Sequence, residues 1–501
     1  MRLASFVALL ALLPMPASHA QSVSLGLFEG HADVGTVSLP GSAAYDASRD
    51  QYVIAGSVRS MTDRDDFHFV WKKMAGNFIL SMRGQLEGNG VEAHRRLGWT
   101  IRPTLAADAP HVTAALHGNG MVSLQTRRAA GGMTEQFQFG DSVAGAMQVL
   151  QIERRDGVYI MSTAVDGDTL VAKTISDVTL PDTVYVGLYV CAHNDTVLER
   201  AYFSNVRITI PAKRDFVPYR DYIGSRLEVL DIASGNARVV HTYEHSFQAP
   251  QYTADGKALV YAQDGLIYRF DLATAKASVV PTGFATRNNN DHVFSWDGKW
   301  LGISNFMTDE GGRSIIHIVP AGGGTPRRVT PSGPSYLHGW SPDQKWLVYA
   351  GQRDGKFDIY RISVNGGPEI RLTDAPGVND GPEYTPDGRW IYFNSARTGL
   401  MQIWRMKPDG SGQEQVTSDH FNNWFPHISP DGQWFTFISF PPDIPPEDHP
   451  FYKHTYIQLM PIDGGKSKVI AYVYGGQGTI NVPSWSPDGR SIAFVSNTEL
   501  H

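Results

Sequence analysis

The sequence predicts an all-β protein in which an N-terminal β-sandwich precedes a six-bladed β-propeller. The main observation is a short phrase (apolar or aromatic residue, Ser or Thr, any residue, Asp) that occurs six times in the second half of the 501-residue chain. Its aspartates are Asp255, Asp297, Asp343, Asp387, Asp431 and Asp488. Repeats of roughly 40–50 residues are typical of β-propellers. The 50 glycines and 30 prolines also suit a protein with many turns.

Residues 1–20 are predicted to be a signal peptide. Arg2 supplies a positive start, Leu3–Leu13 are apolar, and small residues precede a cleavage site after Ala20. We therefore expect a periplasmic or secreted protein, without membrane insertion, because no later stretch is apolar enough to span a bilayer. The net charge of −7 and the lack of a basic run argue against nucleic acid as a partner. Cys191, the single cysteine, is expected to be a buried strand residue.

Residues 22–210 lack the aspartate phrase and show alternating strand patterns instead. Examples are Gln51–Val58, Phe67–Trp71 and Thr183–Tyr189, which are separated from their neighbours by glycine and asparagine turns. Many strands without helical periodicity predict a β-sandwich. Residues 211–222 are polar and are predicted to be a linker between two domains.

The order of the N-terminal segments is also informative. Asp65–Phe69, Gly98–Arg102, His117–Gly120 and Phe203–Ile208 follow one another in a way that resembles the concanavalin A-like jelly-roll domains found beside bacterial carbohydrate enzymes. The resemblance covers most of residues 25–210 and implies a jelly roll. The side chains that would then line a carbohydrate face, or alternatively belong to the core, are Trp71, Trp99, Arg102 and His117.

Residues 223–501 are predicted to form the propeller. In the repeated phrase, proline presets a turn φ, aspartate bonds to turn amides and glycine takes a positive φ, so we expect the six aspartates to be turn residues rather than catalytic ones. The last repeat ends at Ser491–Ser496, before its outer strands. Arg226–Asp231 and Ala237–Thr242 look like two outer strands without an inner pair. Together these segments complete a sixth blade, which closes the ring and pairs its edges.

The repeats over residues 223–498 resemble the TolB-like propeller family, which has WD40-like (PD40) repeats. The resemblance implies an exported, six-bladed propeller. It does not imply one activity, since such propellers serve as protein-binding scaffolds, sensors and sugar-cleaving enzymes.

The loops that enter the inner strands are unusually polar, and we expect them to converge on one rim of the channel. The candidate residues there are Asn290, His292, His338, Asp380, Glu383, Asn423, Trp424, His427 and Gln477. The alternative is that they only satisfy a water-filled channel. The interval from Asp431 to Asp488 is 57 residues, against 44 for the interval before it. The extra residues form a proline-rich insertion near His449, Lys453 and His454, and such loops often carry function.

Three chemistries fit this rim. In the first, His292, His338 and His427, with an acid such as Glu383, bind a divalent metal such as manganese, zinc or iron. This set is similar by residue type to the metal-binding histidines and glutamine of oligogalacturonate lyases, which are propellers with similar turns. A lyase also needs a base and a cation that holds the uronate carboxylate. The sequence offers His449 or His454 as the base, and Lys453 or Arg397 as the cation.

In the second chemistry, Asp380 and Glu383 are a carboxylate pair for glycoside hydrolysis. In the third, Trp424, Tyr474 and the asparagines bind a sugar or a peptide without reaction. A serine hydrolase is not expected, because the Gly-x-Ser-x-Gly phrase is missing. The sequence therefore predicts an exported protein that binds carbohydrate at the propeller rim, and cleavage of that carbohydrate by a lyase or hydrolase is a further hypothesis. The alternative is a non-enzymatic scaffold for an envelope protein.

Overall fold

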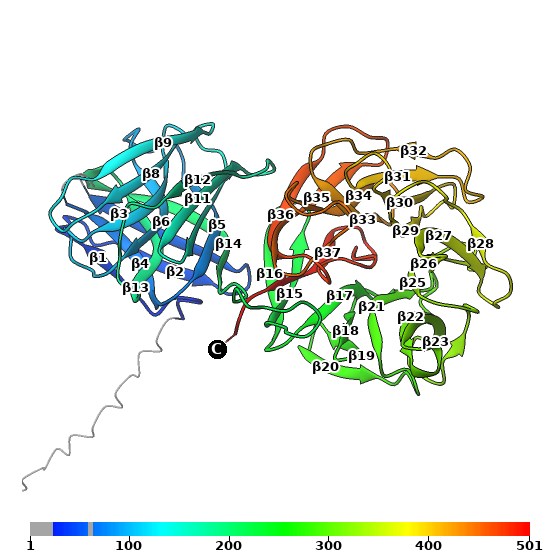
Figure 1. The fold of residues 1–501 in the computed structure, drawn as a ribbon. Helices are drawn as coiled ribbons and strands as arrows, with labels where there is room; N and C mark the ends of the chain where they lie inside the picture. The colour runs from blue at the N-terminus through cyan, green and yellow to red at the C-terminus, as the bar shows by residue number, and fades with distance from the viewer. Residues whose placement is uncertain (1–23, 59–63, 501) are drawn as a thin grey trace, which may run out of the picture.

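The computed structural model describes residues 24–58 and 64–500. They form strands almost throughout, with a single 3-10 helix, η1 (Thr308–Glu310), so the all-β prediction is confirmed. Figure 1 shows two bodies, one made of two large sheets and one made of a ring of small sheets. The predicted signal peptide, residues 1–20, lies outside the described residues. Within the described part of the chain, no helix has the length and apolar character needed to cross a membrane.

The N-terminal body contains two antiparallel sheets of seven strands each. The first sheet consists, in order across it, of β1 (Gly30–Val34), β4 (Phe67–Met74), β13 (Val184–Cys191), β6 (Arg96–Arg102), β7 (His111–His117), β8 (Met121–Arg127) and β9 (Glu135–Asp141). The second consists of β12 (Val171–Ile175), β11 (Val158–Val165), β10 (Gln148–Arg155), β5 (Phe78–Leu86), β14 (Asn194–Thr209), β3 (Gln51–Val58) and β2 (Ser42–Asp46).

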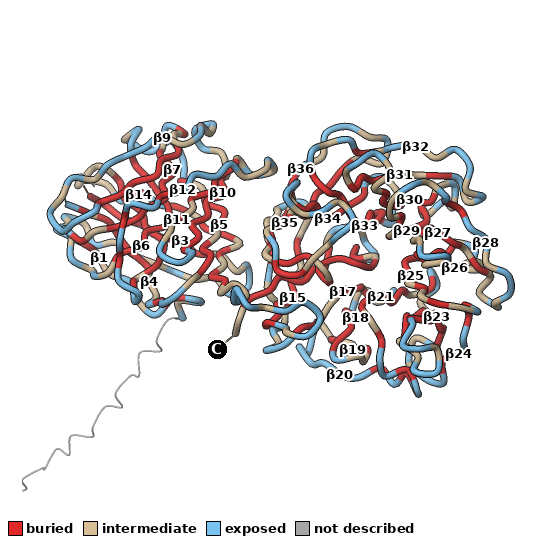
Figure 2. Tube along the Cα trace, in the orientation of Figure 1, coloured by how far each residue is buried: buried red, intermediate tan, exposed pale blue. Residues whose placement is uncertain are grey.

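One apolar cluster takes side chains from both of these sheets. Leu97 and Leu188 come from the first sheet, Leu80 and Leu150 come from the second, and all four are fully buried. Figure 2 shows the buried stretches concentrated inside the body. Alternate residues of a strand point to opposite faces, so the alternating sequence pattern gives each sheet one face on this common core. Cys191, at the end of β13, is buried as expected.

The C-terminal body is a six-bladed β-propeller, as predicted (Figure 1). From the inner strand outward, blade 1 is β17 (Phe247–Tyr252), β18 (Ala258–Gln263), β19 (Leu266–Asp271) and β20 (Lys276–Val280), and blade 2 is β21 (Asn288–Phe294), β22 (Trp300–Met307), β23 (Arg313–Pro320) and β24 (Arg327–Arg328). Blade 3 is β25 (Ser335–Trp340), β26 (Trp346–Arg353), β27 (Lys356–Ser363) and β28 (Ile370–Arg371). Blade 4 is β29 (Asn379–Tyr384), β30 (Ile391–Ser395), β31 (Gln402–Met406) and β32 (Glu414–Gln415), and blade 5 is β33 (Asn422–Ile428), β34 (Trp434–Phe440), β35 (Lys453–Pro461) and β36 (Lys468–Gly475).

Blade 6 is built from both ends of the propeller sequence. Its strands are β37 (Ser491–Asn497), β15 (Ser225–Asp231) and β16 (Ala237–Tyr243). Leu227 of β15 lies opposite Val495 of β37, and a single bridge joins Trp485 to Ile492 on the inner side. The predicted closure is therefore confirmed, and the strand edges at which the ring would otherwise open are paired.

The repeated aspartates stabilise turns, as the sequence predicts. Asp297 accepts a hydrogen bond from the Ser295 hydroxyl at 2.7 Å and another from the Lys299 amide at 3.1 Å. The same two bonds occur at Asp255, Asp343, Asp387, Asp431 and Asp488. Each phrase thus fixes the turn after an inner strand.

Charged side chains join the two bodies. Arg207 on β14 bonds to Glu228 on β15 at 2.7 Å and to Asp50 at 2.9 Å. Arg83 on β5 donates to the Gly235 carbonyl of blade 6 at 2.7 Å. Burial alone would raise the pKa of Glu228, but the charge of Arg207 and its hydrogen bond hold that pKa below its usual range. The two bodies therefore meet through directional, largely buried bonds.

We predict that Glu228→Ala lowers the free energy of unfolding by about 3 kcal/mol, because it removes one of the two carboxylates that compensate the buried Arg207 guanidinium and leaves only Asp50. Urea unfolding of the purified variant measures the loss. Lys345→Ala, which removes an exposed pair with Asp343, is the control and should change stability little. Equal effects of the two substitutions would contradict the structural role of Glu228.

Candidate functional site

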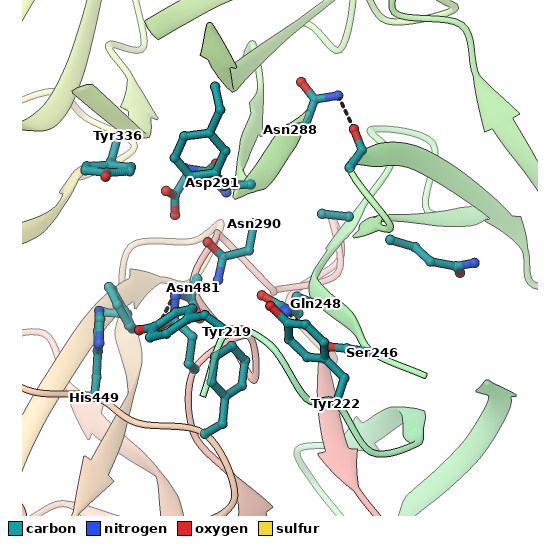
Figure 3. A pocket seen from close by; sticks show the side chains of 18 of the residues that line it. Tyr219, Tyr222, Ser246, Gln248, Asn288, Asn290, Asp291, Tyr336, His449 and Asn481 are labelled. Carbon is teal, nitrogen blue, oxygen red and sulfur yellow. Dashed lines mark hydrogen bonds between the residues drawn. The ribbon is translucent and has the colours of Figure 1, made fainter. Parts of the chain in front are cut away.

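A cavity of about 990 Å³ lies where the inner strands of the six blades meet (Figure 3). The blades line it with their inner strands and with residues of neighbouring strands and loops, and residues 219–222 ahead of the propeller and the insertion between β34 and β35 complete the lining. The insertion contributes Glu447, His449 and Phe451. Amide, carboxyl, imidazole and aromatic groups are all present. A concave site that combines aromatic surface with a few polar groups is typical of a ligand pocket.

Each blade contributes one residue to this cavity from the same position of its repeat. These residues, which we call the channel ring, stand seven positions before the turn aspartates and are Gln248, Asn290, Tyr336, Asp380, Trp424 and Asn481. The ring contains three amides, two aromatic side chains and one carboxyl group. Nothing in it is aliphatic, so the ring offers hydrogen bonds and flat apolar surfaces together.

A break in the strand pairing accompanies the channel ring. In β29, the register shifts by one residue between Asp380 and Glu383. Similar shifts occur in β17, β21, β25 and β33. In blades 1, 4 and 5, the residue after the ring position has a left-handed φ: 56° at Ala249, 59° at Gly381 and 53° at Phe425. β-Bulges of this kind re-aim a side chain, which explains why the strands do not follow simple alternation here.

His338 and Asp380 form an ion pair at the cavity. His338 Nε2 lies 3.1 Å from Asp380 Oδ1, and His338 Nδ1 lies 3.3 Å from the Asn481 carbonyl oxygen. Both ring nitrogens face acceptors, so a protonated ring can donate to each. Burial would lower the pKa of His338, but the hydrogen bond to Asp380 and the nearby carboxylates raise it. Burial would likewise raise the pKa of Asp380, but the bond from His338 and its charge lower it.

Asp291 is a second carboxyl group in the same cavity, and its pKa is raised, whereas that of Asp380 is lowered. Burial, with the charge of Asp380 as a smaller cause, raises the pKa of Asp291 to about 7. The proximity of His338 lowers that pKa only in part. Tyr336 belongs to the same group, because burial and the charges of Asp291, Asp380 and Tyr219 raise its pKa to about 12. The cavity therefore combines a carboxyl group that protonates near neutral pH with one that stays ionised.

Four polar atoms of cavity-lining residues have no hydrogen-bond partner among the described residues. They are Asn288 Oδ1, Asn290 Nδ2, Trp424 Nε1 and His449 Nδ1. The His449 ring packs at a tilt against Trp424, with 4.4 Å between ring centroids, and against Phe425, with 5.4 Å, and burial lowers the pKa of His449. Buried polar atoms are rarely left without a partner. The Asn290 and Trp424 nitrogens are donors, so a ligand with oxygen acceptors would satisfy them.

Six of the residues singled out in the sequence line the cavity. They are Asn290, His338, Asp380, Trp424, His449 and Gln477. The structure thus brings together two predicted catalytic residues, Asp380 and His449, with four predicted ligand-binding ones.

Glu383 and His427 stand outside this lining, contrary to expectation, because they bond neighbouring blades to each other. Glu383 Oε2 lies 2.7 Å from His427 Nδ1, and Glu383 Oε1 accepts a hydrogen bond from the Ile428 amide at 2.9 Å. Gln251 makes the equivalent bond, from the Phe294 amide at 3.0 Å, between blades 1 and 2. In blades 1, 4 and 5, the residue four positions before the turn aspartate therefore bonds to the next blade.

The three predicted metal ligands do not form one site. His338 lies at the cavity, whereas both ring nitrogens of His427 are engaged with Glu383 and the Ile480 carbonyl. His292 lies against the Val260 carbonyl at 3.3 Å, and burial lowers its pKa to about 4. Across residues 24–58 and 64–500, no group of three or more His, Cys, Asp or Glu side chains is arranged to hold a metal ion. The donor set does not fit the predicted divalent metal.

The other predicted residues outside the cavity lining are Asn423, Arg397, Lys453 and His454. Arg397 lies over the Trp404 ring, 4.6 Å from its centroid, inside blade 4. His454 Nε2 bonds to Glu153 of β10 at 3.0 Å and so belongs to the contact with the N-terminal body. The two predicted cations, Arg397 and Lys453, and the predicted base His454 are therefore absent from the cavity lining.

The sequence reasoning missed several lining residues. They are Tyr219, Tyr222, Gln248, Asp291, Tyr336 and Asn481. Gln248, Tyr336 and Asn481 could have been found by counting seven residues back from each turn aspartate. Asp291 lies one residue after the ring position. Tyr219 and Tyr222 come from outside the repeats and carry no such signal.

Known proteins match the propeller half of the chain. Residues 337–442 match the family model "TolB beta propeller domain" (PD40). An uncharacterized protein of Agrobacterium fabrum is 48% identical over 272 residues, which cover 54% of this chain and 92% of that protein. The chain belongs to the TolB-like β-propeller family. The predicted family resemblance is therefore confirmed for the propeller.

One solved structure agrees with this membership. A structure described as "putative TolB from Agrobacterium tumefaciens" is 46% identical, has a TM-score of 0.54, and matches over 56% of this TolB-like chain and 100% of its own. TolB from Acinetobacter baumannii is 17% identical, with a TM-score of 0.40, over 66% of this chain and 78% of its own. An oligogalacturonate lyase in complex with manganese is 15% identical, with a TM-score of 0.37, over 55% and 82%. The last two likenesses are too distant to inform the site.

We predict that Asp291 makes the TolB-like propeller less stable as the pH rises. Its folded pKa of about 7 lies above the value of about 4 expected in the unfolded chain, so the folded protein binds the extra proton between these values. Relative to Asp291→Asn, the free energy of unfolding of the wild type should fall by a few kcal/mol from about pH 4 to about pH 7, then level off. Urea titrations of both proteins across this range measure it. Parallel pH profiles would contradict the raised pKa.

Proposed function

We propose that the propeller cavity binds a neutral oligosaccharide and hydrolyses a glycosidic bond in it. The observation that carries the proposal is the pair Asp291 and Asp380, two carboxyl groups of one cavity whose pKa values are shifted in opposite directions. Pairs whose environments separate their pKa values are the usual source of an acid and a base in one site. Glycoside hydrolysis needs two such carboxyl groups.

The lining favours a neutral, hydroxyl-rich ligand. The ring amides of Gln248, Asn290 and Asn481 offer both donors and acceptors, and Tyr336 adds a flat apolar face. The unpartnered nitrogens of Asn290 and Trp424 call for oxygen acceptors, which sugar hydroxyls and ring oxygens supply. Sugars combine such oxygens with apolar C–H faces, so this mixture of groups supports a sugar rather than a purely apolar ligand.

The reaction assigns different roles to the two carboxyl groups. Protonated Asp291 donates its proton to the oxygen of the leaving sugar while the bond from that oxygen to the anomeric carbon breaks. Asp380 stays ionised and stabilises the positive charge that develops on the sugar ring, as base or as nucleophile. Water supplies the hydroxyl group of the product, and its remaining proton restores the acid. His338 touches Asp380 and positions it, and so acts through that carboxylate.

The lyase alternative has less support. Five acidic side chains line the cavity: Asp221, Asp264, Asp291, Asp380 and Glu447. Among the described lining residues, Arg220 is the single arginine or lysine, and it is paired with Asp221 at 2.7 Å. A uronate carboxylate would meet repulsion here rather than the cation that a lyase needs. Lys453 and Arg397, the predicted cations, lie elsewhere.

A role in protein interaction, without reaction, is the second candidate. Tyr219 is 64% exposed at the cavity, and exposed tyrosines are enriched in binding interfaces. The ring amides suit an extended peptide of an envelope protein as well as a sugar. The two candidates differ in whether a bond is cleaved.

We also propose that the protein is exported and that its N-terminal body is a concanavalin A-like jelly roll. The leader pattern of residues 1–20 supports export. Two seven-stranded antiparallel sheets with a shared apolar cluster support the jelly roll. A domain of this kind would be compatible with a carbohydrate ligand for the propeller.

We predict that the wild type releases reducing ends from one or more members of a panel of neutral oligosaccharides. Asp291→Asn should lower kcat by about 10²- to 10⁴-fold, because it removes the acid that protonates the leaving group. The loss should be much smaller with substrates that carry an activated aryl leaving group, which departs without a proton. A reducing-sugar assay and release of the aryl alcohol measure the two cases.

The matched control is Asp463→Asn, an exposed aspartate on the outer part of blade 5, which should leave kcat unchanged. Wild-type protein that binds a neutral sugar without cleaving it would overturn the hydrolase proposal and leave sugar binding. Protein that binds no member of the panel, but retains a peptide, would favour the scaffold.

A further inference from the structure

Two tyrosines from outside the propeller repeats lie at its cavity. Tyr219 and Tyr222 belong to the interdomain segment, residues 211–222, and both line the cavity (Figure 3). They are 64% and 38% exposed, which is high for aromatic side chains of this size. Exposed aromatic surface at the rim of a pocket commonly marks a place where a ligand packs.

The insertion of blade 5 packs against these tyrosines. Tyr219 and Tyr222 both pack edge-on against Phe451, with centroid distances of 5.3 Å and 5.7 Å. Phe216 packs edge-on against Tyr452 at 4.8 Å. The Tyr452 hydroxyl accepts a hydrogen bond from the Ile223 amide at 3.1 Å. The proline-rich insertion and the interdomain segment therefore form one packed unit beside the cavity.

The segment also has a defined turn of its own. The Asp221 amide donates to the Val217 carbonyl at 2.9 Å, and the Val217 amide donates to the Asp221 carboxylate at 2.9 Å. Tyr219, between them, has a φ of 64°, in the left-handed region that a non-glycine residue adopts at a cost. The surrounding bonds hold this conformation, so the position of the Tyr219 ring is set before any ligand arrives.

The N-terminal body holds the packed unit in place. Glu153 of β10 bonds to His454, two residues after Tyr452, at 3.0 Å. The Tyr474 hydroxyl accepts a hydrogen bond from the Ala212 amide at 3.1 Å. The ring of Tyr474 also stacks on Tyr452, with 6.4 Å between centroids. A continuous set of contacts thus runs from the N-terminal sheets to the tyrosines at the cavity.

We propose that Tyr219 and Tyr222 form an outer sugar-binding subsite, which the docked N-terminal body holds in position and which lengthens the oligosaccharide that the propeller cavity recognises. The inference rests on the proposed function and adds to it the residues that select for ligand length. Tyrosine rings present flat faces with a polar tip, which suits the C–H face and the hydroxyls of a sugar unit. Since the rings are already ordered, little conformational entropy is lost when a sugar packs on them.

Binding of neutral gluco-oligosaccharides, from disaccharide to hexasaccharide, to the full chain tests the inference by calorimetry. In the wild type, affinity should rise with length and then level off. The double variant Tyr219→Ala, Tyr222→Ala should bind the longest member about tenfold more weakly and the disaccharide unchanged. The variant with phenylalanine at both positions should restore most of the difference, because it keeps the rings. Trp434→Ala removes an aromatic ring on blade 5 that is about as exposed as Tyr222 but lies away from the cavity lining, and it is the control.

A variant in the N-terminal body tests whether the two tyrosines must be held in position to bind the sugar. Glu153→Gln weakens the bond to His454 without touching the cavity, and it should reduce affinity for the longest member only. Wild-type length dependence in the double alanine variant would overturn the inference while the proposed function stands. Failure of the wild type to bind any member would overturn the proposed function, and the outer subsite with it.

Discussion

An extra residue in the inner strands separates two positions with different roles, and the geometry of the cavity depends on it. The residue seven positions before the turn aspartate lines the cavity, as Asp380 does. In blades 1, 4 and 5, the residue four positions before it bonds to the next blade, as Glu383 does. The bulge between them breaks simple alternation, so both roles fit into one short strand. Since the turn aspartate anchors the end of each strand, the ring residues of all six blades reach the same place.

The electrostatics of the cavity follow from this arrangement. Asp291, His338 and Asp380 come from three consecutive blades, so the packing of neighbouring blades brings them together, and His338 also reaches the Asn481 carbonyl of blade 6. His338 has acceptors at both nitrogens and pairs with Asp380, which leaves Asp291 buried with weaker compensation. Burial therefore raises the pKa of Asp291, while the bond from His338 and its charge lower the pKa of Asp380. The packing of neighbouring blades around the channel thus creates two different carboxyl groups.

The parts of the structure that depend on local sequence could be predicted. Turn chemistry around residues such as Asp297, the repeat period and the incomplete last repeat led to six blades and to their closure. The site was predicted in part, because polarity pointed to His338 and Asp380 but equally to Glu383 and His427, which bond blades together. A bulge cannot be recognised from the alternation of polar and apolar residues. The sequence therefore did not show that the cavity position lies seven residues before the turn aspartate. Tyr219 was missed because its place depends on how two bodies pack, which no local pattern encodes.

The central claim is that the channel ring is a sugar site in which Asp291 and Asp380 face the bond to be cleaved. The most direct measurement is a crystal structure of Asp291→Asn with a bound neutral oligosaccharide. We expect sugar oxygens within hydrogen-bonding distance of Asn290 Nδ2 and Trp424 Nε1, with a glycosidic oxygen beside the residue at position 291. Sugar found only on the sheets of the N-terminal body, with the channel ring unoccupied, would contradict the account.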